Sequence, residues 1–312
     1  MNSTSGNAIE AQNLVKSYDG KRNAVDDITF SVRKGEIYGL LGKNGAGKST
    51  TIKILTTLID PTSGSVNVLG YSPQKHPLQI KKRIGVVQQA ESFDFTTVEN
   101  NLKVYATLWE IPREEAKSRT EELLELFELT DVRKTRAFEL SGGQKKKLQV
   151  ARELMHDMEV LFLDEPTANL DPEASKVIRD VILKLKGEGR TIFLNTHNLD
   201  EAQRICDRIG ILKTKLIAVD TPKNLENAFP RKVTAIVLTS VNDRILNAVK
   251  SMNPKKLTVE GNTIHIEMAD PDRETPAIVG AISGAGGQVK SVNEEGASLE
   301  DVYLSIVRRE QN

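Results

Sequence analysis

Residues 36–50 read "EIYGLLGKNGAGKST", an apolar run that leads into a glycine-rich turn at the start of a helical segment. A near-continuous apolar run is typical of a strand covered on both faces. The turn "GKNGAGKS" satisfies the spacing G-x-x-x-x-G-K-[ST]. Its glycines let successive backbone N–H groups point at phosphate oxygens, and the helix N-terminus adds a positive end. The stretch predicts a parallel α/β core with a phosphate-binding loop.

Side chains near this loop suggest how a bound phosphate would react. Lys48 can reach β- and γ-phosphates, and the Ser49 hydroxyl can ligate Mg²⁺. The run "EVLFLDEP" (159–166) ends a second apolar strand with Asp164 and Glu165. Asp164 suits the Mg²⁺ shell through water, which leaves Glu165 to orient and polarise an attacking water. Acidic pairs after strands are often only solvated loop ends, but the phosphate loop favours the functional interpretation.

Two more polar residues follow apolar strands. His197 ends "TIFLNTH" (191–197), where it could donate a hydrogen bond to the γ-phosphate, and Gln89 follows "RIGVV" (83–87). Each would be unremarkable alone, so both assignments depend on the phosphate site beside them.

The rest of the first two-thirds of the chain predicts strands and a helical insert. Residues 8–15 and 25–32 alternate in polarity, which indicates antiparallel strands near an edge. Between about 97 and 157 the pattern is helical, with Leu123, Leu124 and Phe127 on one side. We expect Trp109 to pack within this insert.

A second, smaller α+β domain is expected after residues 219–232, where two prolines and two asparagines indicate a linker. We therefore divide the chain into an ATP-binding-type domain over 1–221 and an accessory domain over 222–312. In the latter, the order βαββαβ predicts a ferredoxin-like arrangement with an added helix. The expected strands are 233–239, 256–260, 263–268 and 288–293, and the expected helices are 241–252, 274–284 and 298–309.

Composition excludes several classes of protein. Lys+Arg and Asp+Glu number 43 each among 312 residues, so no overall field favours nucleic acid, and we expect "KKK" (145–147) to be a solvated helix face. Nowhere do about 18 consecutive apolar residues occur, and the N-terminus has no signal-peptide pattern. Cys206 is the only cysteine, which fits a reducing cytosol.

The motifs, taken in order, resemble the ATP-binding subunit of ABC transporters over roughly residues 8–225. They are "GKNGAGKST" (42–50), "LSGGQ" (140–144), "LFLDEP" (161–166), "NLDP" (169–172) and "TH" (196–197). The resemblance implies a P-loop NTPase core with an antiparallel edge sheet that hydrolyses ATP with Mg²⁺. It also implies a head-to-tail homodimer or paired ATPase subunit, in which each ATP is held by one phosphate loop and the other chain's "LSGGQ". Transmembrane permease subunits would hold the pair in the cytoplasm at the inner face of the cell membrane.

The same resemblance assigns site residues. Tyr18 would stack on adenine, with Val25 as an apolar neighbour, and Asp171 would communicate across the dimer. Gln89 would sense Mg²⁺ and face the permease, with Gln88 as the alternative. The implied catalytic set is Lys48, Gln89, Glu165 and His197, and the implied Mg²⁺ ligands are Ser49, Gln89 and Asp164. Further nucleotide contacts would come from Gly42, Asn44, Gly45, Ala46, Gly47, Lys48, Ser49 and Thr50 and, for the partner's ATP, from Ser141, Gly142, Gly143 and Gln144.

Two interpretations of function remain. "SLEDVYLSIV" (298–307) resembles the end of ATPases that serve small-permease exporters, and Phe93 and Phe95 are candidates for the permease contact. The alternative is a soluble ABC-type ATPase of translation, cluster assembly or DNA repair. Translation ATPases usually have two fused cassettes, and cluster-assembly ATPases usually lack an appended domain. DNA-repair ATPases have long coiled coils between the phosphate loop and "LSGGQ", whereas only residues 51–139 lie between these motifs here. Transport is therefore preferred, with a regulatory or dimer-supporting accessory domain.

Overall fold

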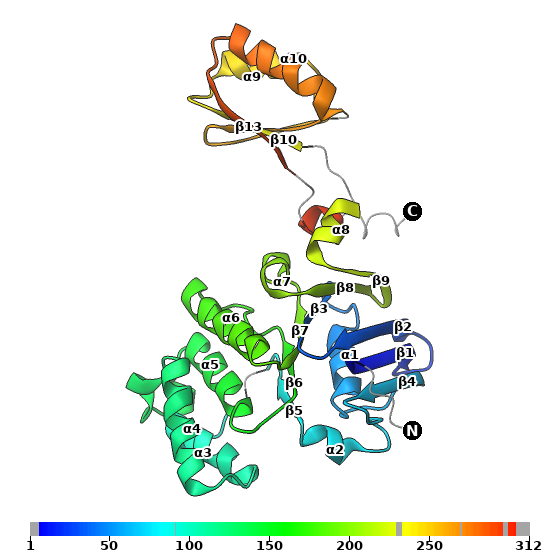
Figure 1. Ribbon diagram of the computed structural model, residues 1–312, viewed down its shortest axis with the longest axis vertical. Coiled ribbons are helices and arrows are strands. Elements are labelled where there is room, and N and C mark those ends of the chain that lie inside the picture. The colour runs from blue at the N-terminus through cyan, green and yellow to red at the C-terminus, as the bar shows by residue number, and fades with distance from the viewer. Residues whose placement is uncertain (1–5, 91, 229–232, 269, 296–298, 304–312) are drawn as a thin grey trace. The chain divides into compact units, whose positions relative to one another are not determined.

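A computed structural model describes residues 6–90, 92–228, 233–268, 270–295 and 299–303 of the chain. The chain forms two compact units, Met1–Pro222 and Lys223–Asn312 (Figure 1). In the described ranges, none of the helices combines the length and apolar character needed to cross a bilayer.

The centre of unit 1 is a six-stranded sheet in the order β5-β6-β7-β3-β8-β9. Neighbouring strands are parallel except β8 and β9, which are antiparallel. Because the carboxyl ends of parallel strands meet at one edge, the segments after β3, β6 and β7 are brought together. The strands are β3 (Ile37–Leu41), β5 (Ile84–Val87), β6 (Val160–Asp164), β7 (Thr191–Thr196), β8 (Arg208–Lys213) and β9 (Lys215–Asp220).

A three-stranded antiparallel sheet in the order β2-β1-β4 confirms the expected edge strands. These strands are β1 (Asn7–Ser17), β2 (Asn23–Arg33) and β4 (Ser63–Val68). Helix α1 (Lys48–Leu55) contacts β2, β4 and β6 and so joins the two sheets. Figure 1 shows the antiparallel sheet on the opposite side of unit 1 from the helical insert.

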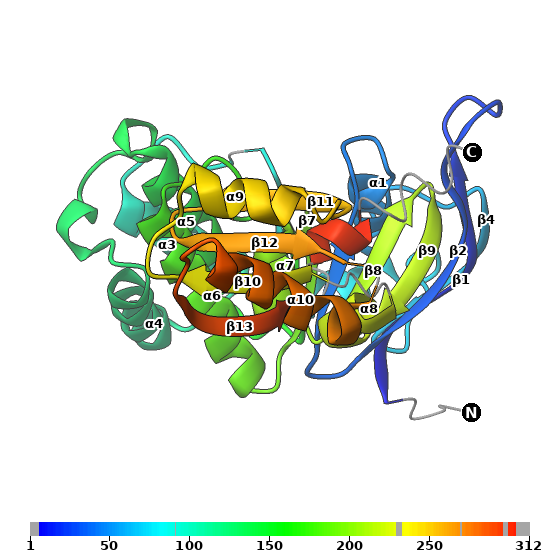
Figure 2. The same cartoon turned by 90° about the horizontal axis from the view of Figure 1, so that it is seen from above.

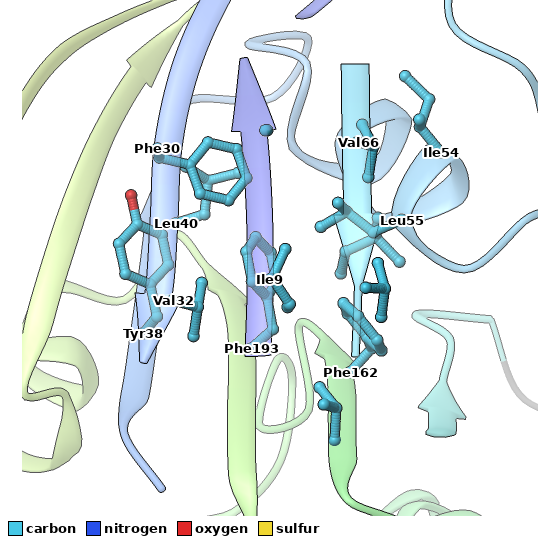
Figure 3. Close-up of a cluster of buried hydrophobic side chains, with 14 of the residues drawn as sticks. Ile9, Phe30, Val32, Tyr38, Leu40, Ile54, Leu55, Val66, Phe162 and Phe193 are labelled. Carbon is cyan, nitrogen blue, oxygen red and sulfur yellow. The ribbon is translucent and has the colours of Figure 1, made fainter. Parts of the chain in front are cut away.

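Aromatic rings pack among aliphatic side chains in the core between these sheets (Figure 3). Phe193 of β7 lies at centroid distances of 5.6 Å from both Tyr38 and Phe162 and 6.0 Å from Phe30. Burial of each such ring contributes about 1.5–3 kcal/mol to folding. This core fixes the strands whose carboxyl ends carry the candidate site.

The helical insert follows β5 and a turn capped by Thr97. Leu123, Leu124 and Phe127 are buried, as their spacing predicted, and Trp109 stacks on His156 with 3.8 Å between ring centroids. Figure 1 shows helices α3, α4 and α5 gathered on one side. The insert comprises α3 (Val98–Leu108), α4 (Arg113–Leu126), η1 (Thr130–Val132), η2 (Ala137–Glu139) and α5 (Gly142–Glu153), and unit 1 also holds α2 (Pro77–Lys81), α6 (Pro172–Gly187) and α7 (Leu199–Ile205).

Unit 2 has the predicted βαββαβ order and an antiparallel sheet in the order β11-β12-β10-β13, which is the ferredoxin-like arrangement. Both views show α9 and α10 on one face of this sheet (Figures 1 and 2), over a core that includes Ile236, Ile264 and Ile266. The elements are β10 (Val233–Leu238), α9 (Asp243–Lys250), β11 (Lys256–Glu260), β12 (Thr263–Glu267), α10 (Pro271–Gly284) and β13 (Val289–Glu295).

The expected linker over 219–232 is partly wrong. Strand β9 continues to Asp220, and helix α8 (Pro222–Ala228) follows directly. Proline is well suited to the first position of a helix, where its missing N–H needs no partner, so Pro222 begins an element rather than breaking one. Residues 299–303 are helical, and the remainder of the predicted helix 298–309 lies outside the described residues.

A half-buried glutamate in α5 predicts a pH effect on stability. Glu153 Oε2 accepts a hydrogen bond from the Val86 N–H at 3.1 Å, and burial raises the pKa of Glu153 from its usual 4.5 to about 7. The unfolded chain therefore loses this proton at lower pH than the folded chain, so stability falls as pH rises from 4.5 to about 7. A glutamine side chain at this position can still accept the hydrogen bond and does not ionise.

The Glu153→Gln variant is therefore expected to melt about 2–4 °C above the parent at pH 8, for a gain of about 1 kcal/mol. The difference should shrink at pH 5, where the parent's Glu153 is mostly protonated. Thermal unfolding at both pH values measures this, with Glu125→Gln on the exposed face of α4 as the control. An equal or lower melting temperature at pH 8 would contradict the prediction.

Candidate functional site

The phosphate loop joins β3 to α1 and depends on two glycines. A Cβ at Gly42 would lie 2.5 Å from the Leu212 carbonyl oxygen. Gly47 has a φ of +101°, and a Cβ there would lie 2.3 Å from the Ala24 carbonyl oxygen. Gly47 is also the N-cap of α1. The loop is thus held close to its neighbours with its backbone near the start of a helix, where N–H groups lack intrahelical partners.

Lys48 lies between the loop and the carboxylate that follows β6. Its side chain is 6% exposed, its Nζ donates to the Gly42 carbonyl oxygen at 2.7 Å, and the same Nζ lies 3.5 Å from Glu165 Oε1. A buried ammonium requires compensation by an opposite charge or by several oxygens. The loop carbonyls and Glu165 supply both kinds of compensation. The positive charge of the Lys48 ammonium is therefore held beside the loop that is predicted to bind phosphate.

Glu165 is fixed by its backbone and by His197. Its φ of +53° lies in the left-handed region, which costs an L-residue about 1–2 kcal/mol, and its N–H donates to the Asn195 carbonyl oxygen at 2.9 Å. Glu165 Oε2 lies 2.7 Å from His197 Nδ1 and accepts the His197 N–H at 3.3 Å. Strain at a site so constrained is typical of functional residues.

The His197 ring is 59% exposed while the Glu165 side chain is 6% exposed. An ionised Glu165 requires a proton on Nδ1, which leaves Nε2 of a neutral ring as an acceptor. For Nε2 to donate to a γ-phosphate, as the sequence predicts, the ring must carry a second proton or release Glu165.

The residue types predicted to hold magnesium suit that ion. Asp164 is 8% exposed and its Oδ1 accepts from Asn195 Nδ2 at 3.2 Å. Carboxylate, hydroxyl and amide oxygens are the ligands that Mg²⁺ prefers, and it is usually held by one or two carboxylates plus phosphates. Asp164, Ser49 and Gln89 offer this set, while the described residues contain no cluster of three His, Cys, Asp or Glu. Their roles as ligands stay predictions.

The two predicted adenine contacts differ. Tyr18 is 63% exposed, and its Oη lies 3.3 Å from Thr50 Oγ1, so its ring is accessible beside the phosphate loop. Val25 is 0% exposed, and its Cγ2 would lie 3.2 Å from a Cβ at Gly47. Val25 is thus buried beside the phosphate loop, and its contact with the nucleotide stays a prediction.

The "LSGGQ" stretch forms the start of α5. Ser141 Oγ accepts the Gln144 N–H at 3.2 Å and Gln144 Oε1 accepts the Ser141 N–H at 3.1 Å, which is a capping box. Ser141 and Gly142 are exposed. A Cβ at Gly143 would lie 2.8 Å from Ala174 Cβ and 3.3 Å from Asp171 Oδ2. The first turn of α5 thus presents backbone to solvent and rests on the start of α6.

The predicted residues form two groups. Lys48, Glu165 and His197 contact one another at the carboxyl ends of the parallel strands. The side-chain hydrogen bonds of Ser141, Gln144 and Asp171 are instead formed within the first turns of α5 and α6. Gln88 and Gln89 are both exposed in the loop after β5, and their placement does not choose between them.

Sequence reasoning missed two residues in this region. Asn195 lies within a fully buried strand and contacts both Asp164 and Glu165. Glu201 is 1% exposed and accepts from Thr167 Oγ1 at 2.7 Å, and burial raises its pKa. An asparagine in the otherwise apolar run "TIFLNT" was the available signal for the first.

Comparison with known proteins finds a matching family model and relatives that align over almost the whole chain. The family model described as ABC transporter matches residues 25–168. The linearmycin resistance ATP-binding protein of Bacillus subtilis is 31% identical over 96% of this chain and 98% of its own length. The Nod factor export ATP-binding protein of Rhizobium johnstonii is 35% identical over 99% of both chains.

Solved structures agree. The structure of an ATP-binding subunit of an ABC transporter has a TM-score of 0.66 and 29% identity to this chain, covering 71% of this chain and 93% of its own. A dimeric ATP-binding cassette in a post-hydrolysis state with ADP and Pi has a TM-score of 0.63 and 25% identity, covering 68% of this chain and 98% of its own. The transporter interpretation is confirmed over the soluble alternative: this chain belongs to the ABC transporter family, as an ATP-binding subunit that hydrolyses ATP.

Proposed function

We propose that two copies of this chain, or this chain and a paired ATPase subunit, bind two ATP molecules head to tail and drive a separate transmembrane exporter from the cytoplasmic face. The observation that carries the proposal is the division of the site into two groups. Lys48, Glu165 and His197 form a site for the phosphates of the nucleotide on this chain's own phosphate loop. The first turn of α5 exposes Ser141 and Gly142 and does not contribute to that site. A second copy supplies a nucleotide for this turn.

The chain's own groups suit the hydrolytic step. Lys48 and the loop N–H groups stabilise charge that develops on the phosphate oxygens. Glu165, held by Lys48 and His197, orients a water and accepts its proton. A magnesium ion held by Ser49 and Asp164 would neutralise charge on the phosphates. The exposed His197 ring contacts Glu165 and can respond to the γ-phosphate.

Export as the direction of transport is supported by the relatives. Their names describe Nod factor export and linearmycin resistance, and the alignments span 96–99% of this chain, so they include unit 2. We assign residues 222–312 a regulatory or dimer-supporting role.

The loop after β5 and the start of α3 are proposed to face the permease. Phe95 is 85% exposed, so most of its ring is available to an apolar partner. Phe93 is half-buried, because it packs edge-on against Phe95 at 6.4 Å and lies under Lys145 Nζ at 5.5 Å. Phe95 is therefore the better candidate for the contact.

Affinity capture tests the membrane partner. Tagged Glu165→Gln protein, incubated with ATP and Mg²⁺ in gently solubilised native membranes, should recover a protein with several membrane spans. The same protein carrying Phe95→Asp in addition should recover at least about fivefold less, since the contact loses its apolar anchor. Recovery of soluble proteins alone, with the ATP-bound dimer intact, would contradict the proposed permease.

A further inference from the structure

Glu201, a buried glutamate of α7, takes no part in the proposed hydrolytic step. It is 1% exposed, and its Oε1 accepts a hydrogen bond from Thr167 Oγ1 at 2.7 Å. Thr167 is itself 9% exposed and lies two residues after Glu165. A carboxyl group is costly to bury, so its place in the interior depends on the contacts that it makes there. The Glu201 carboxyl therefore reaches the segment that carries Glu165 from another element of the fold.

The backbone of Glu201 is fixed to the other side of the site. Helix α7 begins directly after its N-cap, Asn198. The Glu201 N–H donates to Asn198 Oδ1 at 3.1 Å, and the Asn198 N–H donates to Thr196 Oγ1 at 3.0 Å. A side-chain oxygen at the N-cap satisfies an N–H that has no partner within the helix. These bonds fix the backbone on both sides of His197, and the first turn of α7 carries Glu201.

Two contacts consequently join the segment after β6 to the segment after β7. The outer contact links Glu165 Oε2 to His197 Nδ1 at 2.7 Å, and the His197 ring is 59% exposed. The inner contact links Thr167 to Glu201, and both of these side chains are buried. A buried group that loses its hydrogen-bond partner bears the full cost of its desolvation. The inner contact is therefore suited to fix the spacing of the two segments.

Glu165 requires such a restraint because its backbone lies in an unfavourable region. Its φ is +53°, and such conformations persist only where the surrounding structure determines them. Before the side chain, the pairing of β6 with β7 holds the end of the strand, and the Glu165 N–H donates to the Asn195 carbonyl oxygen. After it, Pro166 has no N–H to donate, and Thr167 is held by Glu201. Glu165 is thus restrained along the chain from both directions.

The surroundings of Glu201 raise its pKa. Burial is the main cause, and the nearby charge of Glu165 acts in the same direction. The hydroxyls of Thr167 and Thr196 and the charge of Arg179 act in the opposite direction. Glutamine resembles a neutral glutamate in shape and keeps an oxygen that can accept the Thr167 hydroxyl. It is therefore the conservative replacement at this position, whereas leucine removes the acceptor.

We propose that Glu201 is a positioning residue for ATP hydrolysis. By accepting the Thr167 hydroxyl, it holds the segment after β6. This segment keeps the Glu165 carboxylate against His197 and in place to orient the attacking water. Glu201 acts through Thr167 and exchanges no proton with the substrate. The inference rests on the role of Glu165 as the base in the proposed function.

The test uses variants of the full chain that separate the bond from its effect on stability. Glu201→Leu removes the acceptor, and Thr167→Val removes the donor with little change in shape. The double variant replaces both partners by apolar groups, which can restore much of the stability that either single change loses. Glu201→Gln keeps the acceptor. The matched control is Glu36→Gln, because Glu36 is 7% exposed and accepts the Arg33 N–H at 2.7 Å but precedes β3, at the opposite end of the sheet from the site.

Three measurements are made on each variant. Turnover is measured against ATP concentration, thermal unfolding gives the stability, and ¹⁵N NMR reports which nitrogen of His197 carries the proton. The chain has four histidines, and the His197 signal is assigned by its loss in His197→Ala. In the parent, the contact with Glu165 should keep the proton of the neutral ring on Nδ1. The NMR measurement needs neither nucleotide nor a second copy of the chain.

Glu201→Leu, Thr167→Val and the double variant should each lower kcat about tenfold, since a small misplacement of a catalytic group can cost up to about 100-fold. The KM for ATP should change less than about twofold, because the phosphate loop is unchanged. The double variant should be no slower than either single variant and should melt closer to the parent. In all three, the neutral His197 ring should shift from the Nδ1–H form toward the Nε2–H form. Glu201→Gln and Glu36→Gln should keep the parent's turnover and tautomer.

Recovery of turnover in the double variant together with its stability would overturn the proposal, because the bond would then be only structural. Unchanged turnover or an unchanged His197 tautomer in Thr167→Val would also overturn it, as would an equal loss in Glu201→Gln and Glu201→Leu. Parent-like turnover by Glu165→Gln would instead contradict the proposed role of Glu165. The NMR comparison separates these failures because it does not depend on turnover, and Thr167→Val alone provides it if Glu201→Leu fails to fold.

Discussion

The Glu165→Gln variant is expected to bind ATP with the parent's affinity and to hydrolyse it at least about 100-fold more slowly, since a positioned base contributes about 10²–10⁴-fold. Its Oε2 position is set by His197 Nδ1 at 2.7 Å, and a glutamine oxygen can accept the same hydrogen bond. The geometry is therefore kept while the basic group is lost. Single-turnover measurements with radiolabelled ATP separate the loss of chemistry from any change in binding.

The same variant should accumulate as a dimer in ATP and Mg²⁺, because the nucleotide that joins the two copies persists. Gel filtration with light scattering is expected to show about twice the monomer mass with ATP and the monomer with ADP. Glu188→Gln, at the exposed end of α6, is the control and should hydrolyse ATP like the parent. A Glu165→Gln protein that remains monomeric at saturating ATP would count against the shared site.

The core and the phosphate loop could be predicted because their signals are local. A strand covered on both faces must be apolar throughout, and the turn after β3 requires glycine at Gly42 and Gly47 for reasons of space and backbone angle. Both constraints can be recognised from a few consecutive residues of the sequence. The ferredoxin-like order of unit 2 was similarly readable from strand and helix lengths.

The failures concern residues whose surroundings come from distant parts of the chain. Val25 alternates like any half-exposed strand residue, yet it is fully buried. Lys146 and Lys147 look like solvated lysines, yet the Gln88–Ala90 carbonyls and Glu128 supply their partners. Polarity along one helix cannot show which polar side chains will find buried partners on another segment.

The Ser141→Arg variant tests whether each ATP site needs two chains. Ser141 is exposed at the N-cap of α5, so an arginine there would project into the partner's nucleotide without touching the chain's own phosphate loop. Affinity of dilute protein for ATP should change less than about twofold, while turnover should fall at least about 100-fold, as for loss of groups that stabilise transition-state charge.

Ser141→Ala separates the steric block from the loss of the cap. It removes the hydroxyl that accepts the Gln144 N–H, which costs about 1 kcal/mol of stability, but leaves the turn open to a nucleotide. We expect it to melt lower than the parent and to retain most of the turnover that Ser141→Arg loses. Equal turnover in the two variants would assign the effect to the cap alone.

Mixing supplies the decisive comparison. Ser141→Arg keeps an intact phosphate loop, and Lys48→Ala keeps an intact first turn of α5, so a head-to-tail heterodimer of the two contains one complete site. Random pairing of equal amounts makes half the dimers mixed, which restores up to about a quarter of the parent's sites. Each protein alone should be inactive and the mixture active. Parent-like turnover by Ser141→Arg on its own would mean that one chain holds a complete site, and the head-to-tail dimer would have to be abandoned.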